Sequence, residues 1–322
     1  MDEFSFINSI KQPYYRQSTL QKGIGDDAAV FRQTSNDIVT AVDTFVEGIH
    51  FAKKTMPAFY IGYRALAATL SDLAAMGANP AFYLVSIVIP KGWHEDDKLQ
   101  EIFRGMDCLA SKYGLDLIGG DTVSGLELTI SITVIGYVQK NKARYRSLSK
   151  PGDIVFVTGT LGDSQAGLYI LMNEGNYVNE EYFIQRHQTP IPRIDFVKSF
   201  ANINRIALND ISDGVASEAR EIANESQVNI ILNIEKIPMS KDFNQFPLHL
   251  QNKWKLFGGE DFEILGTVPV KNWPEIKMAG KQTNVQVTKI GYVDDEKKEG
   301  QVFLQESNQI YPLHKQGYTH LK

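Results

Sequence analysis

The chain has 322 residues, 43% of them hydrophobic and 22% charged, so it is long enough for two well-filled domains and too apolar to be disordered. Its formal net charge is −5 and it contains no block of Lys or Arg, which argues against nucleic acid as a partner. The single cysteine, Cys108, excludes an internal disulfide and a cysteine-rich metal site, and it fits a reducing, cytoplasmic location. We expect Cys108 to be a small core residue of a helix.

The first twelve residues contain two early acids and no basic stretch followed by an apolar run, so no export signal is expected. The longest apolar runs, such as 82–90, have the length and the β-branched content of strands. We therefore expect no membrane span.

Helical periodicity marks the segment 57–76, which begins with Pro57 and ends at Gly77. The elements expected next are a strand over 82–89, a helix over 94–113, a short strand over 115–120 and a long strand over 126–138. The last of these alternates apolar and polar residues, which predicts an antiparallel strand with one face exposed or covered by a partner.

The turn-rich stretch 147–153 predicts a domain boundary, which we place between 1–149 and 150–322. Beyond it the patterns predict helices over 162–174, 179–186, 192–202 and 213–225, and strands over 205–210, 228–234, 261–268 and 285–293. Helices and strands alternate in both halves, so the fold class is α/β or α+β with two domains.

Acidic residues beside glycine or at the ends of apolar runs recur along the chain. They are Asp26, Asp27, Asp43, Asp72, Asp121, Asp210, Asp213, Glu260 and Asp261. We expect Asp43 and Asp121 to follow strands at a sheet edge, where ligand sites gather. Asp72 lies in a mostly apolar helix, where a carboxylate is costly unless it is exposed, paired or bound to metal. Oxygen ligands without a His or Cys cluster favour Mg²⁺, Ca²⁺ or Mn²⁺ over zinc or copper.

Each of these motifs also has a purely structural explanation. The stretch GIGDD can be a solvated turn, Asp72 an exposed helix position, and Asp213 or Ser212 the N-cap of the following helix. The glycines of 119–120, 258–259 and 158–167 allow backbone N–H groups to approach a phosphate, although tight turns need the same residues. Neither a Walker A sequence nor a protein-kinase motif set is present, so nucleotide chemistry would need another scaffold.

Two basic residues and one histidine are further candidates for the site. Arg146 precedes the domain boundary and could bind a phosphate through its fork of N–H groups, with Arg144 as the competing choice. His50 could contact a substrate, or it could be structural.

Taken together, GIGDDAAV, VDTFVEGIHF, LSDLAAMGANP, GGDT, TGTLGDSQAGL, DISDG and FGGEDFEIL closely resemble the thiamine-monophosphate kinase family, in order from about 23 to 320. That family belongs to the aminoimidazole ribonucleotide synthetase-like superfamily. The resemblance implies an N-terminal sheet domain that binds ATP and Mg²⁺ and forms a homodimer, and a C-terminal α/β domain that closes the active-site cleft. It also implies ATP-dependent phosphorylation of thiamine monophosphate to thiamine diphosphate, by direct in-line transfer with several Mg²⁺ ions and no covalent nucleophile.

Carried over residue by residue, the resemblance assigns three sets of positions. The Mg²⁺ ligands would be Asp27, Asp43, Asp72, Asp121, Asp210 and Asp213. The nucleotide contacts would be Phe103, Gly120, Asp121, Arg146 and Ser212, and the substrate contacts His50, Glu260 and Tyr318. Ala41 and Val42 could offer only backbone carbonyls to a metal, and Phe103 lacks the hydroxyl of the Tyr that relatives carry.

Two alternatives stay open at this point. The chain could be another ATP-using enzyme of the superfamily, such as aminoimidazole ribonucleotide synthetase, or a nucleotide-binding protein without catalytic activity. Selenophosphate synthetase would need a reactive cysteine near the N-terminus and a hydrogenase maturation factor one at the C-terminus, and Cys108 is at neither place.

Overall fold

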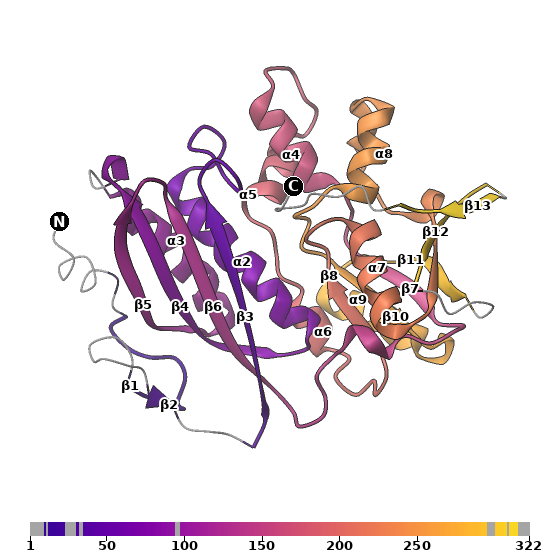
Figure 1. Cartoon of the computed structure of the whole chain (residues 1–322), viewed down its shortest axis with the longest axis horizontal. Helices are drawn as coiled ribbons and strands as arrows, with labels where there is room; N and C mark the ends of the chain where they lie inside the picture. Colours follow the sequence, from indigo (N-terminus) through magenta and orange to yellow (C-terminus); the bar gives the residue numbers. More distant parts are fainter. Residues whose placement is uncertain are drawn as a thin grey trace. The chain divides into compact units, whose positions relative to one another are not determined.

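The computed structural model describes residues 10, 12–22, 30–31, 35–93, 97–294, 300–307 and 309–314. The chain divides into two compact units, one within residues 1–73 and 78–141 and the other within 74–77 and 142–322 (Figure 1). The division at 149/150, with the roles assigned to each part, stays a prediction. Among the described residues no helix has the length and apolar content needed to cross a bilayer.

The first unit is built on a four-stranded sheet with helices packed along it. Its strands lie in the order β3 (Asp37–Val46), β6 (Thr129–Val138), β4 (Asn79–Pro90) and β5 (Asp116–Gly125). Only the β4–β5 pair is parallel. The helices are α2 (Ala58–Ala75) and α3 (Lys98–Tyr113), and β1 (Leu20–Lys22) pairs with β2 (Val30–Phe31) in a small separate sheet (Figure 1).

Helices α2 and α3 contact each other almost backbone to backbone, because each presents a glycine where they meet. A Cβ added at Gly62 would lie 1.8 Å from the carbonyl oxygen of Ile102, and one added at Gly105 would lie 1.9 Å from that of Phe59. Neither position can carry a side chain unless the helices move apart.

The sheet of the first unit has one buried and one open face. In β6 the residues of 130–134 alternate between buried and half-buried, as the sequence pattern predicted, and β6 pairs antiparallel on both sides. On the open face of the edge strand β3, Ile38 and Val42 are 50% and 62% exposed. Alternate residues of a strand point to opposite faces, so among the described elements the helices cover one face and leave Ile38 and Val42 exposed on the other.

The second unit is built on a seven-stranded mixed sheet. Its order is β13 (Gln309–Pro312), β12 (Val302–Glu306), β9 (Asn229–Asn233), β11 (Val287–Asp294), β7 (Ile154–Thr158), β10 (Ile264–Val268) and β8 (Ala207–Asp210), with only β12 and β9 parallel. The helices are α4 (Asp163–Met172), α5 (Glu180–Gln188), α6 (Ile194–Lys198), α7 (Val215–Ser226), α8 (Leu248–Phe257) and α9 (Trp273–Thr283). An aliphatic core joins α7 to the sheet, and a separate aromatic cluster fills the space among α4, α5 and α8.

Most elements predicted from the sequence are present, with boundaries shifted by a few residues. The predicted helix 192–202 shrinks to the single turn of α6, and the predicted strand 115–120 extends to Gly125. Cys108 is exposed, so its prediction as a core residue is wrong: Ile102, Met106 and Leu109 form the buried face of α3.

Candidate functional site

The predicted site residues divide between the two units. His50, Asp43, Asp72, Phe103, Gly120 and Asp121 lie in the first unit, and Arg146, Asp210, Ser212, Asp213 and Glu260 lie in the second. Asp26, Asp27 and Tyr318 lie outside the described residues.

Asp43 lies inside strand β3, not after its end, which corrects the expectation from the sequence. Its carboxylate faces α2, where it shares a hydrogen bond with the side chain of Thr69. Burial raises the pKa of Asp43, and the hydrogen bond to Thr69 opposes that rise. Thr69 and Asp72 are three residues apart on the same helix, so they share one helix face. The half-buried Asp72 therefore lies on the side of α2 that Asp43 approaches.

Asp43 and Asp121 sit on the two opposite edge strands of the sheet. Asp43 pairs with Ile132, Ile132 with Val85, and Val85 with Gly120, so this row crosses the sheet without reaching Asp121. Asp121 also lies within its strand, not after it. Three strand spacings separate the edges by about 14 Å, so a single ion cannot bind both carboxylates of one chain.

Gly120 is needed because β4 and β5 approach each other closely at this point. A Cβ at Gly120 would lie 2.0 Å from the carbonyl oxygen of Val85, whereas one at Gly119 would make only ordinary contact, 3.5 Å from Leu84. Asp121 follows directly and is exposed, with one carboxylate oxygen accepting the N–H of Thr122 at 2.9 Å.

His50 lies in the turn that follows β3. Its Nδ1 accepts the backbone N–H of Val46 at 3.1 Å, and its ring packs edge-on against Phe45 with the ring centres 5.4 Å apart. In the neutral ring the proton must then be on Nε2. This leaves the Nε2–H as the donating group of His50.

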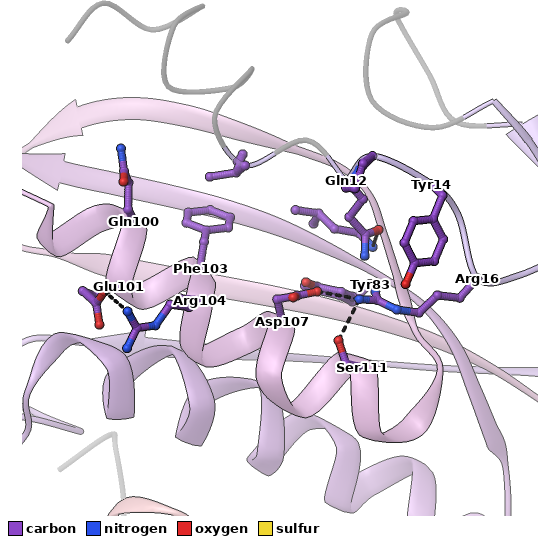
Figure 2. Close-up of a pocket in the computed structure, with 13 residues that line it drawn as sticks. Gln12, Tyr14, Arg16, Tyr83, Gln100, Glu101, Phe103, Arg104, Asp107 and Ser111 are labelled. Carbon is purple, nitrogen blue, oxygen red and sulfur yellow. Dashed lines mark hydrogen bonds and ion pairs between the residues drawn. The ribbon is translucent and has the colours of Figure 1, made fainter.

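A cavity of about 560 Å³ lies within the first unit, beside α3 (Figure 2). Phe103, Tyr14 and Tyr83 contribute aromatic surface to its lining. The side-chain carbonyl of Gln12 accepts the N–H of Leu117 at 2.9 Å, while its buried Nε2 has no hydrogen-bond partner among the residues that the structure describes. The cavity thus combines aromatic walls with an unused donor, which suits a flat heterocycle that carries an acceptor.

The end of this cavity beside Gln12 and Tyr14 is held by a network around Arg16 (Figure 2). Its guanidinium donates to the carboxylate of Asp107 at 2.8 Å, to the hydroxyl of Ser111 at 2.7 Å and to the carbonyl of Leu115 at 2.7 Å (Figure 2). These bonds tie the segment before β1 to α3. They fix the shape of the cavity at that end.

In the second unit the predicted residues gather around a carboxylate that the sequence analysis missed, that of Glu218 on α7. Glu218 is 5% exposed, and its Oε1 accepts the hydroxyl of Ser212 at 3.2 Å and the N–H of Asp213 at 3.1 Å. Its Oε2 accepts the side-chain amide of Asn209, whose own oxygen accepts Nε of Arg146 at 3.0 Å. An acidic residue in the first turn of a predicted helix was the one signal that could have identified it.

Excess negative charge surrounds Glu218. Burial and the neighbouring Asp210 raise the pKa of Glu218 to about 8, Asp213 adds to the rise, and the N–H of Asp213 and the cation of Arg146 oppose it. Asp210 itself is 3% exposed at the end of β8. Carboxylates packed this closely favour a cation nearby.

Glu260 lies in a strained segment that is anchored on both sides. Glu260 and Phe262 both have positive φ, at 70° and 50°, which non-glycine residues seldom adopt. The N–H of Glu260 donates to the carbonyl of Ser212 at 2.7 Å. Asp261 and Glu263, on either side of Phe262, are buried, so their contacts hold the segment in this conformation.

The start of α4 is not open to a phosphate, which corrects the proposal made for the glycines of 158–167. The carboxylate of Asp261 already accepts the N–H groups of Gly162 at 2.6 Å and Ser164 at 3.1 Å. Burial raises the pKa of Asp261 to about 7, while Arg186 opposes the rise. The GGED motif thus supplies an internal cap for this helix.

The two candidate arginines differ in burial and in hydrogen bonding. Arg144 is 3% exposed and donates to the backbone carbonyls of Ile203, Phe200 and Ala201. Its guanidinium is therefore committed to structure. Arg146 is exposed and uses only Nε in a described side-chain bond, so it is the arginine that can reach a ligand.

Comparison with known proteins identifies relatives over the whole chain. Residues 25–138 match the family model of the AIR synthase related protein N-terminal domain, and residues 150–303 match that of its C-terminal domain. A thiamine-monophosphate kinase of Bacillus subtilis is 44% identical over the full length of both chains. That of Escherichia coli K12 is 34% identical over 94% of this chain and 92% of its own.

Solved structures agree with this relationship. Thiamine-monophosphate kinase from Stenotrophomonas maltophilia superimposes with a TM-score of 0.82 at 28% identity, covering 93% of this chain and 94% of its own. AaThiL complexed with AMPPCP and TMP superimposes with a TM-score of 0.77 at 30% identity, covering 99% and 97%. The mixed α/β fold with two domains, predicted from the sequence, is confirmed.

Proposed function

The chain belongs to the thiamine-monophosphate kinase family, and we propose that it phosphorylates thiamine monophosphate with ATP to give thiamine diphosphate and ADP. The observation that carries this proposal is identity of 44% to a thiamine-monophosphate kinase from end to end. The relative complexed with AMPPCP, an ATP analogue, and TMP supports the same pair of substrates.

The reaction needs no covalent enzyme intermediate. An oxygen of the thiamine phosphate attacks the γ-phosphorus of ATP, the bond from that phosphorus to the bridging oxygen breaks, and ADP leaves with the electron pair. The attacking phosphate is already largely ionised, so no general base is required. Positioning and charge neutralisation then supply most of the acceleration.

Mg²⁺ is proposed as the metal, with Asp27, Asp43, Asp72, Asp121, Asp210 and Asp213 as its protein ligands. The donors are hard carboxylate oxygens, and the buried Asp43 and the crowded group around Glu218 would both gain from a cation. Among the described residues no group of three or more His, Cys, Asp or Glu side chains is placed to hold one ion. Mg²⁺ is usually bound in proteins by one or two carboxylates and completed by substrate phosphates. When bound, Mg²⁺ would neutralise phosphate charge as it develops.

ATP contacts are proposed for both units. Arg146 and Ser212 would bind phosphate oxygens, with Gly120 and Asp121 as contacts from the first unit. The cavity lined by Phe103 would take the adenine base, since an apolar ring in place of Tyr still stacks on a heterocycle. Gln12 Nε2 would donate to a ring nitrogen of the base.

Thiamine monophosphate is proposed to contact His50, Glu260 and Tyr318. The Nε2–H of His50 suits a phosphate oxygen, because Nδ1 is already occupied by Val46. Glu260 brings a carboxylate suited to the cationic thiazolium ring of the substrate. Its strained backbone is typical of residues held for a function rather than for stability.

A homodimer is proposed through the open face of the four-stranded sheet. Exposed apolar residues such as Ile38, Val42 and Val123 lie on strands of this sheet, at 50%, 62% and 46% exposure. A second copy would cover this apolar surface. A cytoplasmic location also stays a prediction.

The test is an ADP-release assay coupled to separation of thiamine phosphates. We expect release of ADP and appearance of thiamine diphosphate only when thiamine monophosphate, ATP and Mg²⁺ are all present. Turnover with aminoimidazole ribonucleotide precursors instead would favour the alternative enzyme. Nucleotide binding without turnover of either substrate would favour a nucleotide-binding protein without catalytic activity.

A further inference from the structure

Glu218 links residues that the family resemblance assigns to ATP and Mg²⁺, although the resemblance gives no role to Glu218 itself. It lies one turn into α7, behind the loop 210–213, and its two oxygens serve different neighbours. One oxygen holds the loop through Ser212 and Asp213. The other reaches Arg146 by way of Asn209.

The polarity of this chain of hydrogen bonds is fixed at both ends. Arg146 can only donate, so the oxygen of the Asn209 side chain must face it and the NH₂ group of Asn209 must face Glu218. The N–H of Asp213 can also only donate. The residue at 218 must therefore accept on both of its terminal atoms, which a carboxyl group can do and the amide of Gln cannot.

The backbone around Arg146 is held independently of this chain. The carbonyl of Arg146 accepts the hydroxyl of Ser226 at 2.6 Å, and the same hydroxyl accepts the N–H of Ser149 at 3.0 Å. Ser226 is the last residue of α7 and Glu218 lies near the start of the same helix. The C-terminal end of α7 therefore fixes the main chain of Arg146, and its N-terminal part fixes the guanidinium. The side chain of an exposed arginine is thereby kept in one orientation.

We propose that Glu218 and Asn209 are positioning residues that hold the Arg146 guanidinium and the loop 210–213 in one arrangement for the phosphates of Mg²⁺-bound ATP. The inference rests on the proposed function for the identity of the nucleotide. A structural role alone, as a cap for the start of α7, would use only the N–H of Asp213 and would leave Asn209 and Arg146 unexplained.

Glu218→Gln is the discriminating variant, because its one carbonyl can still accept from Asp213 and Ser212 while its NH₂ group cannot accept from Asn209. We expect the Kd for AMPPNP with Mg²⁺, measured by titration calorimetry, to rise roughly tenfold, as one lost hydrogen bond to a charged group would predict. The KM for ATP should rise with it and the KM for thiamine monophosphate should stay within twofold. Glu225→Gln, an exposed change on the same helix, should leave all three values unchanged.

A double-variant comparison tests whether Glu218 acts through Arg146. Arg146→Ala alone should weaken AMPPNP binding, and adding Glu218→Gln should weaken it little further. Additive losses would contradict the relay. An unchanged Kd in Glu218→Gln would overturn the proposal, even if the melting temperature falls.

Asn209→Leu provides the second variant in case Glu218→Gln does not fold. It keeps the bonds of Glu218 to Ser212 and Asp213 and removes only the link to Arg146, so an unchanged Kd would again overturn the proposal. The binding measurement needs no turnover. A wild-type protein that binds AMPPNP but does not phosphorylate thiamine monophosphate would refute the proposed function while leaving the positioning role testable.

Discussion

The buried carboxylate of Glu263 offers the sharpest test of the energetics of the second unit. It is 0% exposed, and it accepts Nε of Arg193 at 2.6 Å, a second N–H of the same guanidinium, Nη2 of Arg186 at 2.8 Å and the hydroxyl of Thr158 at 2.6 Å. The hydroxyl of Thr158 in turn accepts the N–H of Ile264 at 2.8 Å, so its proton must point to Glu263. We expect Glu263→Gln to remove the acidic partner of Arg193 and one acidic neighbour of Arg186, which also lies 3.9 Å from Asp163.

The size of the effect follows from two arguments. Burial alone would raise the pKa of Glu263, but Arg193, Arg186 and the hydrogen bonds lower it from an ordinary 4.5 to about 2. A difference of that size corresponds to roughly 3 kcal/mol of stability. Removing one partner of a buried ion pair typically costs about 3–5 kcal/mol. We therefore expect Glu263→Gln to lower the free energy of unfolding at pH 7 by about 3 kcal/mol.

Urea unfolding followed by tryptophan fluorescence provides the assay, because Trp254 and Trp273 both lie in the second unit. The folded pKa lies below the unfolded one, so the stabilisation is fully present above about pH 4.5 and is lost as the pH falls towards 2. The difference between wild type and variant should shrink over that range. Glu174→Gln, at an exposed site, should change little. A loss below about 1 kcal/mol at pH 7 would refute the reasoning.

Three further predictions concern the first unit. Asp43→Asn should lower turnover at least 100-fold, the cost of losing a charged contact to the reacting group. The metal-free variant should be no less stable to urea than the wild type, because burial raises the pKa of Asp43 and its ionised form opposes folding. A loss of stability that matches the loss of turnover would count against a metal role. Gly120→Ala should destabilise by about 1–3 kcal/mol in thermal unfolding and Gly119→Ala by much less, since only the first would push a Cβ into the carbonyl of Val85. Val42→Lys should convert a dimer to a monomer in sedimentation velocity, and a wild-type monomer at micromolar concentration would contradict the proposed sheet contact.

The sequence predicted the fold where local patterns are strong. The helix 57–76 and the strands of 82–89 and 126–138 are confirmed because apolar periodicity and flanking Pro and Gly agree there. The strand before Asp43 was expected to end there, but β3 continues to Val46, because polar residues such as Asp43 and Thr44 interrupt the apolar run that marks it. Helix α8 was missed because its polar face gives little contrast with the surrounding loops.

The site was predictable as a set of residues, and its geometry was not. Spacing along the chain marked Asp43 and Asp121 as candidates, but strand order alone places them on opposite edges of the sheet, and strand order depends on contacts distant in sequence. Glu218 and Gln12 escaped notice because their significance lies in hydrogen bonds to partners that no local motif reveals. The glycines of 158–167 were expected to let backbone N–H groups approach a phosphate, whereas the carboxylate of Asp261 already accepts those groups.

The close contact between α2 and α3 makes these two helices a rigid unit. Their backbones approach closely at Gly62 and Gly105, where no Cβ separates them. Asp72 is carried on one helix and Phe103 on the other. A displacement of Asp72 would therefore be passed on to Phe103, and the reverse. The distance between the base of a nucleotide at Phe103 and a metal ion at Asp72 would then depend on the absence of Cβ atoms at Gly62 and Gly105.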